Sequence, residues 1–285
     1  MPVLRRAIVV TAGIVVFLLL AGATYQGAAT ALERRQFPHP GRLVDVGGRQ
    51  LHIYCIGQGS PTVVLEAPAA GMSAAWGWVQ PDVGRHTRTC SYDRAGLGWS
   101  EAGETAYDPA AVPEQLHALL ERAGEMPPYV VVGEGLGAAF AAMYASRFPP
   151  AVAAVVLLDP PMSEPEAAPR DTAARLGSSA PWLARTGVLR ATRLMSSTAS
   201  GLPPASAGAL AAFLNRPDHL TRTARELSRW NDAVHLAAQS SLDGIFVVRE
   251  HLGPDGQMAS LADESQAARA SAAIDAAIRH ARVIR

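Results

Sequence analysis

A glycine-rich turn between an apolar strand and a helix is the segment of this chain best suited to chemistry. The turn reads Gly133-Glu134-Gly135-Leu136-Gly137-Ala138 and follows a buried strand expected at 129–132. Its spacing fits the G-x-G-x-x-G/A pattern, in which a pyrophosphate binds at the helix N-terminus and an acidic residue about 20 positions later binds ribose. Asp159 ends the next apolar strand, expected at 154–158, so dinucleotide binding is one hypothesis.

Three segments around this turn resemble the α/β-hydrolase family, with lipases and esterases as the nearest comparison. They read VDVGGRQLHIYCIGQGSPTVVLEA (44–67), YDRAGLGWSEAG (92–103) and YVVVGEGLGAAFAAMYASRFP (129–149). The resemblance spans roughly residues 40–160 and implies a mostly parallel sheet flanked by helices, with a helical cap. It also places residues 133–137 at the family's nucleophile elbow, where the serine of G-x-S-x-G attacks the substrate.

The elbow departs from the family pattern at its central position. Gly135 stands where the serine is expected, and because glycine has no side chain the covalent step lacks its attacking atom. Glu134 stands where relatives often have histidine, and its negative charge would oppose the stabilisation of an oxyanion. Pro68, after the third strand, has no N–H, so the resemblance leaves the N–H groups of Ala69 and Leu136 for the oxyanion role.

The acid and the histidine of the family pattern are also displaced. The family's histidine follows a glycine after the last strand, and this chain contains no Gly-His dipeptide. One strand is expected after the cap, at 245–248. If it is the seventh strand, Glu250 lies near the acid position and the histidine loop is lost; if it is the last, His251 approximates the histidine. We favour the first interpretation, with Asp159 as an alternative acid and His280 in the terminal helical stretch.

The remaining pattern indicates the α/β class, because strands alternate with helices. Further strands are expected at 43–46, 50–55, 62–66 and 87–92, and helices at 110–123, 136–148 and 259–281. Residues 162–240 are rich in Ala, Arg, Leu, Ser and Pro and have helical periodicity. We interpret them as a helical cap within a hydrolase-like domain at 42–285.

The N-terminus carries a membrane or export signal. A basic tail at 1–6 precedes a stretch without charged residues at 7–32, which is long enough to span a bilayer as a helix. A linker is expected at 33–41. The alternative is a signal peptide cleaved at Ala21-Gly22-Ala23, which fits a small-x-small site. Both interpretations place residues 40–285 outside the cytoplasm.

Composition narrows the classes of function. The 285 residues include 25 basic and 25 acidic side chains, so nothing indicates disorder or nucleic-acid binding. Two cysteines are too few for a zinc site built from cysteine, and no metal or cofactor is expected. The resemblance puts Cys55 and Cys90 on neighbouring strands, either as a disulfide in an exported domain or as two buried thiols.

The sequence therefore predicts a membrane-anchored α/β-hydrolase-fold protein that lacks the family's serine. The first functional hypothesis is a catalytically impaired member that binds a small apolar or ester-like ligand, or a protein partner. The second is a hydrolase in which Glu134 or Glu250 activates water. Dinucleotide binding is the remote alternative, because the glycine-rich turn follows four strands instead of opening its domain, and Pro160 follows the acid.

Overall fold

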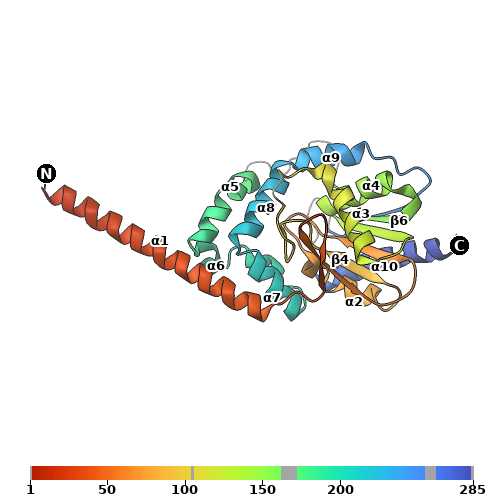
Figure 1. Ribbon diagram of the computed structural model, residues 1–285, viewed down its shortest axis with the longest axis horizontal. Coiled ribbons are helices and arrows are strands. Elements are labelled where there is room, and N and C mark those ends of the chain that lie inside the picture. The colour runs from red at the N-terminus through yellow and green to blue at the C-terminus, as the bar shows by residue number, and fades with distance from the viewer. Residues whose placement is uncertain (1, 104–105, 162–171, 254–260, 284–285) are drawn as a thin grey trace.

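One mixed sheet organises the chain, which a computed structural model describes at residues 2–103, 106–161, 172–253 and 261–283. Within these residues the sheet has seven strands in the order β1-β2-β4-β3-β5-β6-β7 (Figure 1). Their bounds are β1 (Arg42–Asp45), β2 (Gln50–Ile56), β3 (Thr62–Glu66), β4 (Thr89–Tyr92), β5 (Tyr129–Glu134), β6 (Val152–Leu158) and β7 (Phe246–Glu250). β2 pairs antiparallel with β1 and β4, and the other pairs are parallel.

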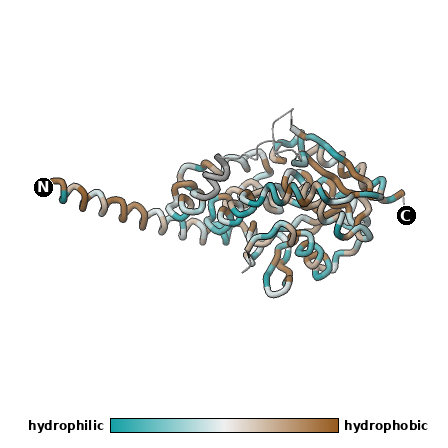
Figure 2. The backbone as a smooth tube through the Cα atoms, turned by 90° about the horizontal axis from the view of Figure 1, so that it is seen from above, coloured by the Kyte–Doolittle hydropathy of each residue, from teal (hydrophilic) through white to brown (hydrophobic). Residues whose placement is uncertain are grey.

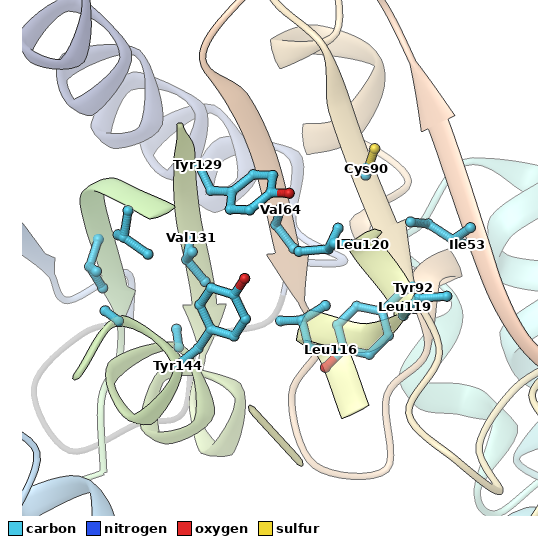
Figure 3. Packing of buried hydrophobic residues seen from close by; sticks show 14 of the residues in the cluster. Ile53, Val64, Cys90, Tyr92, Leu116, Leu119, Leu120, Tyr129, Val131 and Tyr144 are labelled. Atoms are coloured by element: carbon cyan, nitrogen blue, oxygen red, sulfur yellow. The ribbon is translucent and has the colours of Figure 1, made fainter. Parts of the chain in front are cut away.

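Both faces of the sheet are buried, which explains why its central strands are apolar without alternation. On one face, Val64 and Val131 pack with Leu116 of α3 (Figure 3). On the other, Val63 and Val130 pack with residues of α2 and α10. The flanking helices are α2 (Val79–Val83), α3 (Val112–Ala123), α4 (Leu136–Arg147) and α10 (Glu264–Val283). Successive strand residues point to opposite faces, so β3, β5 and β6 each contribute to both cores.

The chain between β6 and β7 is helical, as expected for the cap at 162–240, of which residues 162–171 lie outside the described part. Its helices are α5 (Thr172–Arg185), α6 (Val188–Thr192), η4 (Ser196–Ala199), α7 (Pro204–Phe213), α8 (Pro217–Ser228) and α9 (Trp230–Ala238). α5 packs on α8, and α9 packs on α4. The short 3-10 helices elsewhere are η1 (Ser73–Trp76), η2 (Pro109–Ala111) and η3 (Pro149–Ala151).

The N-terminal helix α1 (Pro2–Gln36) extends away from the body of the molecule (Figures 1 and 2). It is long and apolar enough to cross a membrane, although a signal sequence would have the same properties. One expected boundary needs correction. The helix continues through Gln36, so a linker does not begin at residue 33. Within the stretch 7–32, Gln26 is buried against the cap helices.

Several boundaries differ from the sequence-based expectation. The helix expected at 110–123 begins as the 3-10 turn η2, because Asp108 accepts a hydrogen bond from the N–H of Ala110 and caps that turn. Glu134 and Glu250 belong to their strands instead of following them, since each pairs in register with the neighbouring strand at Leu158. The terminal helix α10 begins at Glu264, and residues 254–260 lie outside the described part.

β7 pairs parallel with β6 at the edge of the sheet. Within the described residues no strand follows it, and α10 returns to the face of the sheet that α2 covers. A single strand beside β6 fits both interpretations of the last strand, so the choice between Glu250 as the acid and His251 as the histidine stays a prediction.

Cys55 and Cys90 form a disulfide between β2 and β4, where they are register partners. The bridge closes a loop with a sequence separation of 35. We predict that the double variant C55S/C90S loses on the order of 3–4 kcal/mol of unfolding free energy, because the bridge limits the entropy of the unfolded chain. Urea denaturation of both proteins measures the loss. Titration of the unfolded wild type without reductant should detect no free thiol, and two thiols would contradict the bridge.

Candidate functional site

The elbow between β5 and α4 keeps the backbone of a nucleophile turn around a glycine. Gly135 has φ 54 and ψ −121, a conformation that L side chains rarely adopt. A Cβ on Gly133 would overlap the carbonyl of Gly137, and a Cβ on Gly137 would overlap the carbonyls of Glu66 and Ala67. At Gly135 no heavy atom lies within 4 Å of the position of a Cβ. The two outer glycines are therefore required by packing, whereas the space for a central side chain remains empty.

The loop after β3 lies beside this elbow and forms a tight turn. The N–H of Gly71 donates to the carbonyl of Pro68 at 3.0 Å, and Ala70 has a positive φ of 60. Leu136 is the first residue of α4, so its N–H has no acceptor within the helix. Among the described residues neither this N–H nor that of Ala69 donates a hydrogen bond. Both groups are available to a carbonyl oxygen, as an oxyanion site requires.

A buried arginine fixes the loop that carries Ala69. Arg94 donates to Glu66 at 2.6 Å and, through Nε and Nη2, to both carboxylate oxygens of Glu226 at 2.9 Å. It also donates to the carbonyls of Ala67 at 2.6 Å and Pro68 at 3.0 Å. All five N–H donors of the guanidinium are thereby used. Arg94 thus joins the end of β3, the loop after it and the cap helix α8.

The electrostatics of this network follow from complete burial. Arg94, Glu66 and Glu226 are at most 3% exposed. Burial raises the pKa of Glu66 against the opposing effect of Arg94 and a hydrogen bond from Tyr92. Burial alone would lower the pKa of Arg94, but the carboxylates of Glu226 and Glu66 outweigh it and hold that pKa well above the ordinary value. The arginine is charged at every accessible pH, so removing its partners would leave a buried cation.

His219 provides a second link between α8 and the same loops. Its Nδ1 accepts a hydrogen bond from the N–H of Gly98 at 3.1 Å, and its Nε2 lies 3.0 Å from the carbonyl of Ala70. This pair of contacts suits a neutral imidazole that donates through Nε2. Burial lowers the pKa of His219, which agrees with the neutral form. Arg94 and His219 therefore hold the cap helix α8 against the loop after β3 at two points.

Glu134 is the buried acid next to Gly135. It is 5% exposed, and no hydrogen bond to its carboxylate is found among the described residues. Burial, with a smaller contribution from the negative charge of Asp159, raises the pKa of Glu134 to about 8. The side chain is then mostly protonated at neutral pH. Burial of Glu134 therefore weakens the expectation that its side chain carries a negative charge at the site.

The remaining acid and base candidates lie at the ends of β6 and β7. Nδ1 of His251 is 3.6 Å from Oδ1 of Asp159, and the histidine side chain is 70% exposed. Asp159 also accepts the N–H of Leu252 at 3.0 Å. Glu250 forms an ion pair with Arg269 of α10 at 2.5 Å. His280 stacks on Phe246 with ring centroids 3.8 Å apart, so it packs within the fold.

The structure thus unites some of the candidates and separates others. Asp159 lies between Glu134, which it influences electrostatically, and His251, which it contacts. Glu250 is engaged with α10 and His280 with β7. Sequence reasoning missed Glu66, Arg94, Glu226 and His219 as a connected set. An acidic residue at the end of the apolar strand β3 is the one signal that indicated a buried charge in need of a partner.

Comparison with known proteins agrees with this architecture. The model of the α/β hydrolase fold family matches residues 61–243, which is more than half of the chain. The chain belongs to the α/β-hydrolase fold family. The sheet order differs from the 3-2-1-4-5-6 order of dinucleotide-binding domains.

Curated relatives include hydrolases. A 2-hydroxy-6-oxo-2,4-heptadienoate hydrolase of Pseudomonas putida is 30% identical over 121 residues, which are 41% of this chain and 44% of the relative. The uncharacterized protein YbdG of Bacillus subtilis is 26% identical over 163 residues, or 55% of this chain and 49% of the relative. The matches span about half the length of these relatives.

Solved structures share the fold. An enol-lactonase from Burkholderia xenovorans superposes with a TM-score of 0.59 at 14% identity, covering 84% of this chain and all of the lactonase. The Cif epoxide hydrolase from Acinetobacter nosocomialis superposes with a TM-score of 0.62 at 14% identity, covering 80% of each chain. At these identities the likeness establishes the fold alone.

We predict that Glu226→Ala destabilises the protein by about 3–5 kcal/mol, because it leaves the charge of Arg94 buried with only one carboxylate. Glu226→Gln keeps hydrogen-bond acceptance and should lose less. Glu114→Ala is the matched control, since Glu114 pairs with Arg147 at the surface, where a pair contributes at most about 1 kcal/mol. Urea denaturation measures all three, and equal losses in E226A and E114A would contradict the role of Arg94.

A second prediction concerns pH. The pKa of Glu134 is about 8 in the folded protein and 4.5 when unperturbed, so between these values the folded state holds a proton that the unfolded state releases. The contribution of Glu134 to stability therefore falls as pH rises from 5 to 8, by at most roughly 1.4 kcal/mol per pH unit. Glu134→Gln should remove this slope. Urea denaturation at pH 5, 6, 7 and 8 measures it, and identical slopes in both proteins would contradict the buried acid.

Proposed function

We propose that this protein is a membrane-anchored, extracytoplasmic α/β-hydrolase-fold protein with impaired catalysis, which binds a small apolar or ester-like ligand beside the old elbow. The observation that carries the proposal is Gly135. Its φ of 54 and ψ of −121 put a nucleophile-turn backbone at the start of α4, and no side-chain oxygen or sulfur is attached there. The scaffold for attack is present, whereas the attacking atom is absent.

Ligand binding is supported by what surrounds the glycine. The N–H groups of Ala69 and Leu136 remain free to donate to the carbonyl oxygen of an ester-like molecule, and Arg94 holds the loop that presents Ala69. Apolar residues of α4 and α9 pack around Ala69 and Leu136. A small ester or ketone can be bound in this way, with its carbonyl oxygen accepting from the two N–H groups and its apolar part packed against the apolar residues. No nucleic acid or cofactor enters this proposal.

The α1 helix supports the membrane part of the proposal. It is exposed and without charged residues from Ala7 to Ala21, as expected of a segment in a bilayer. The disulfide between Cys55 and Cys90 suits an oxidising compartment, and so supports an extracytoplasmic body. Arg5 and Arg6 precede the apolar stretch, which favours a cytoplasmic N-terminus.

The competing function is a hydrolase that works through a carboxylate. Glu134 is the candidate in the elbow, but with a pKa of about 8 roughly 90% of it is protonated at pH 7, so it is a poor base there. Glu250 is held by Arg269. The exposed His251 and its partner Asp159 could assist a water, and they keep this alternative open to experiment.

We predict no turnover of p-nitrophenyl acetate or butyrate by the full chain in detergent above a heat-inactivated control, and no labelling by a fluorophosphonate probe. The reason is the missing nucleophile, whose loss typically lowers the rate by several powers of ten. Turnover in wild type that disappears in Glu134→Gln would contradict the proposal and support the carboxylate mechanism.

Gly135→Ser tests the remaining machinery. The space at Gly135 admits a serine side chain, but among the described residues no strand follows β7 to carry the family's histidine loop, so hydrolysis should stay within about tenfold of wild type. Gly124→Ser is the matched control for placing serine at a positive φ with open space around it. Efficient hydrolysis and fluorophosphonate labelling by G135S alone would show that His251 already serves as the base.

A further inference from the structure

The anchor helix is fitted to the cap, which determines the part of the body nearest the membrane. Gly22 of α1 lies so close to the α5–α6 turn that a Cβ on it would overlap the carbonyl of Thr186. Gly187 faces the same segment, since its Cβ position lies 3.0 Å from the carbonyl of Gly22. α6 accordingly lies beside the C-terminal half of α1 in Figure 1.

A polar cluster fixes the helix in this position. Arg190 of α6 donates to Gln26 at 2.9 Å and forms an ion pair with Glu33, both on α1. Gln26 is 5% exposed and donates to the carbonyl of Asn215 at 2.8 Å. Because these groups are satisfied by the cap, this part of α1 belongs to the body of the protein. The uncharged stretch left outside the body is residues 7–21, about 22 Å at 1.5 Å per residue, which is shorter than the hydrocarbon thickness of about 30 Å, so a bilayer around it reaches the level of the cap.

The α5–α6 turn therefore lies where α1 leaves the bilayer, and its surface is apolar and basic. Its exposed apolar side chains and their exposed fractions are Trp182 69%, Leu183 38%, Val188 45% and Leu194 60%. Arg185 and Arg193 are also exposed, and the guanidinium of Arg185 lies 4.8 Å from the Trp182 ring. The segment from Trp182 to Gly201 contains no acidic residue. We call these six side chains the apex surface.

We propose that the apex surface inserts into the bilayer interface beside α1 and binds acidic phospholipid headgroups. Tryptophan and arginine are favoured at this depth, because the ring and the aliphatic stem enter the apolar zone while the polar ends meet headgroups. Tyr25, half-exposed on α1 at the same level, belongs to the same aromatic belt. The inference rests on the anchoring proposed above and adds a second, independent contact of the cap with lipid.

Two properties of the apex surface favour a bilayer as its binding partner: its continuity with the apolar part of α1 and its positive charge. The apex surface is continuous with the exposed apolar part of α1, which no other part of the described chain covers. Its arginines lack acidic neighbours in the segment from Trp182 to Gly201 and complement anionic lipids. A protein partner of the apex surface would not require that surface to lie beside the apolar part of α1.

The test uses the full chain reconstituted into vesicles of phosphatidylcholine and phosphatidylglycerol that contain brominated phosphatidylcholine, a quencher of tryptophan. Flotation after an alkaline carbonate wash first checks the anchoring. In vesicles that retain the chain, we expect bromine to quench wild-type fluorescence and Trp182→Phe to lose at least two-thirds of the quenched signal. Trp230→Phe, on the distant α9, is the matched control and should keep it.

The outcomes separate the two proposals. If the chain fails to float, anchoring is wrong. If it floats and W182F is quenched as strongly as wild type, the apex surface does not reach the bilayer and is left to a protein partner. The double variant R185E/R193E keeps Trp182 and tests the headgroups: its quenching should fall at least twofold relative to wild type in vesicles with phosphatidylglycerol. Equal quenching of this variant, with an unchanged near-ultraviolet circular dichroism spectrum, would overturn the binding of acidic lipid.

Discussion

The site depends on the hydrogen bonds and ion pairs of the buried Arg94 guanidinium. It uses all five donors on two carboxylates and two carbonyls, and these acceptors come from β3, the loop after β3 and helix α8. A buried cation is tolerated only when its partners are all present, so the three parts must assemble together. The cap is consequently fixed over the elbow by charge, with His219 as a neutral second link.

The turn at Gly135 keeps a defined shape within this arrangement. Gly133 and Gly137 are required by backbone contacts, and Gly135 has a positive φ at the start of α4. The N–H groups of Ala69 and Leu136 donate no hydrogen bond among the described residues. The proposed ligand would bind beside this turn, and the high pKa of Glu134 keeps that environment mostly uncharged at neutral pH.

Ion pairs also connect the cap to α1. Arg190 of α6 pairs with Glu33 of α1, as Arg94 pairs with Glu226 of α8. Gly22 and Gly187 allow the backbones of α1 and of the turn between α5 and α6 to approach closely. The cap therefore contacts both α1 and, through Arg94, the loop after β3.

By itself the sequence determined what local pattern can determine. The apolar strands, the glycine frame of the elbow, the missing serine and the apolar N-terminal stretch depend on periodicity and residue type within short windows. Only the tertiary structure decided which distant groups meet: Arg94 with Glu226, 132 positions away, Arg190 with Glu33, and Asp159 with His251. It also decided the protonation of Glu134, because desolvation depends on burial by residues far along the chain. Local propensity carries no record of those partners, since ion pairs and burial arise only when separate elements pack.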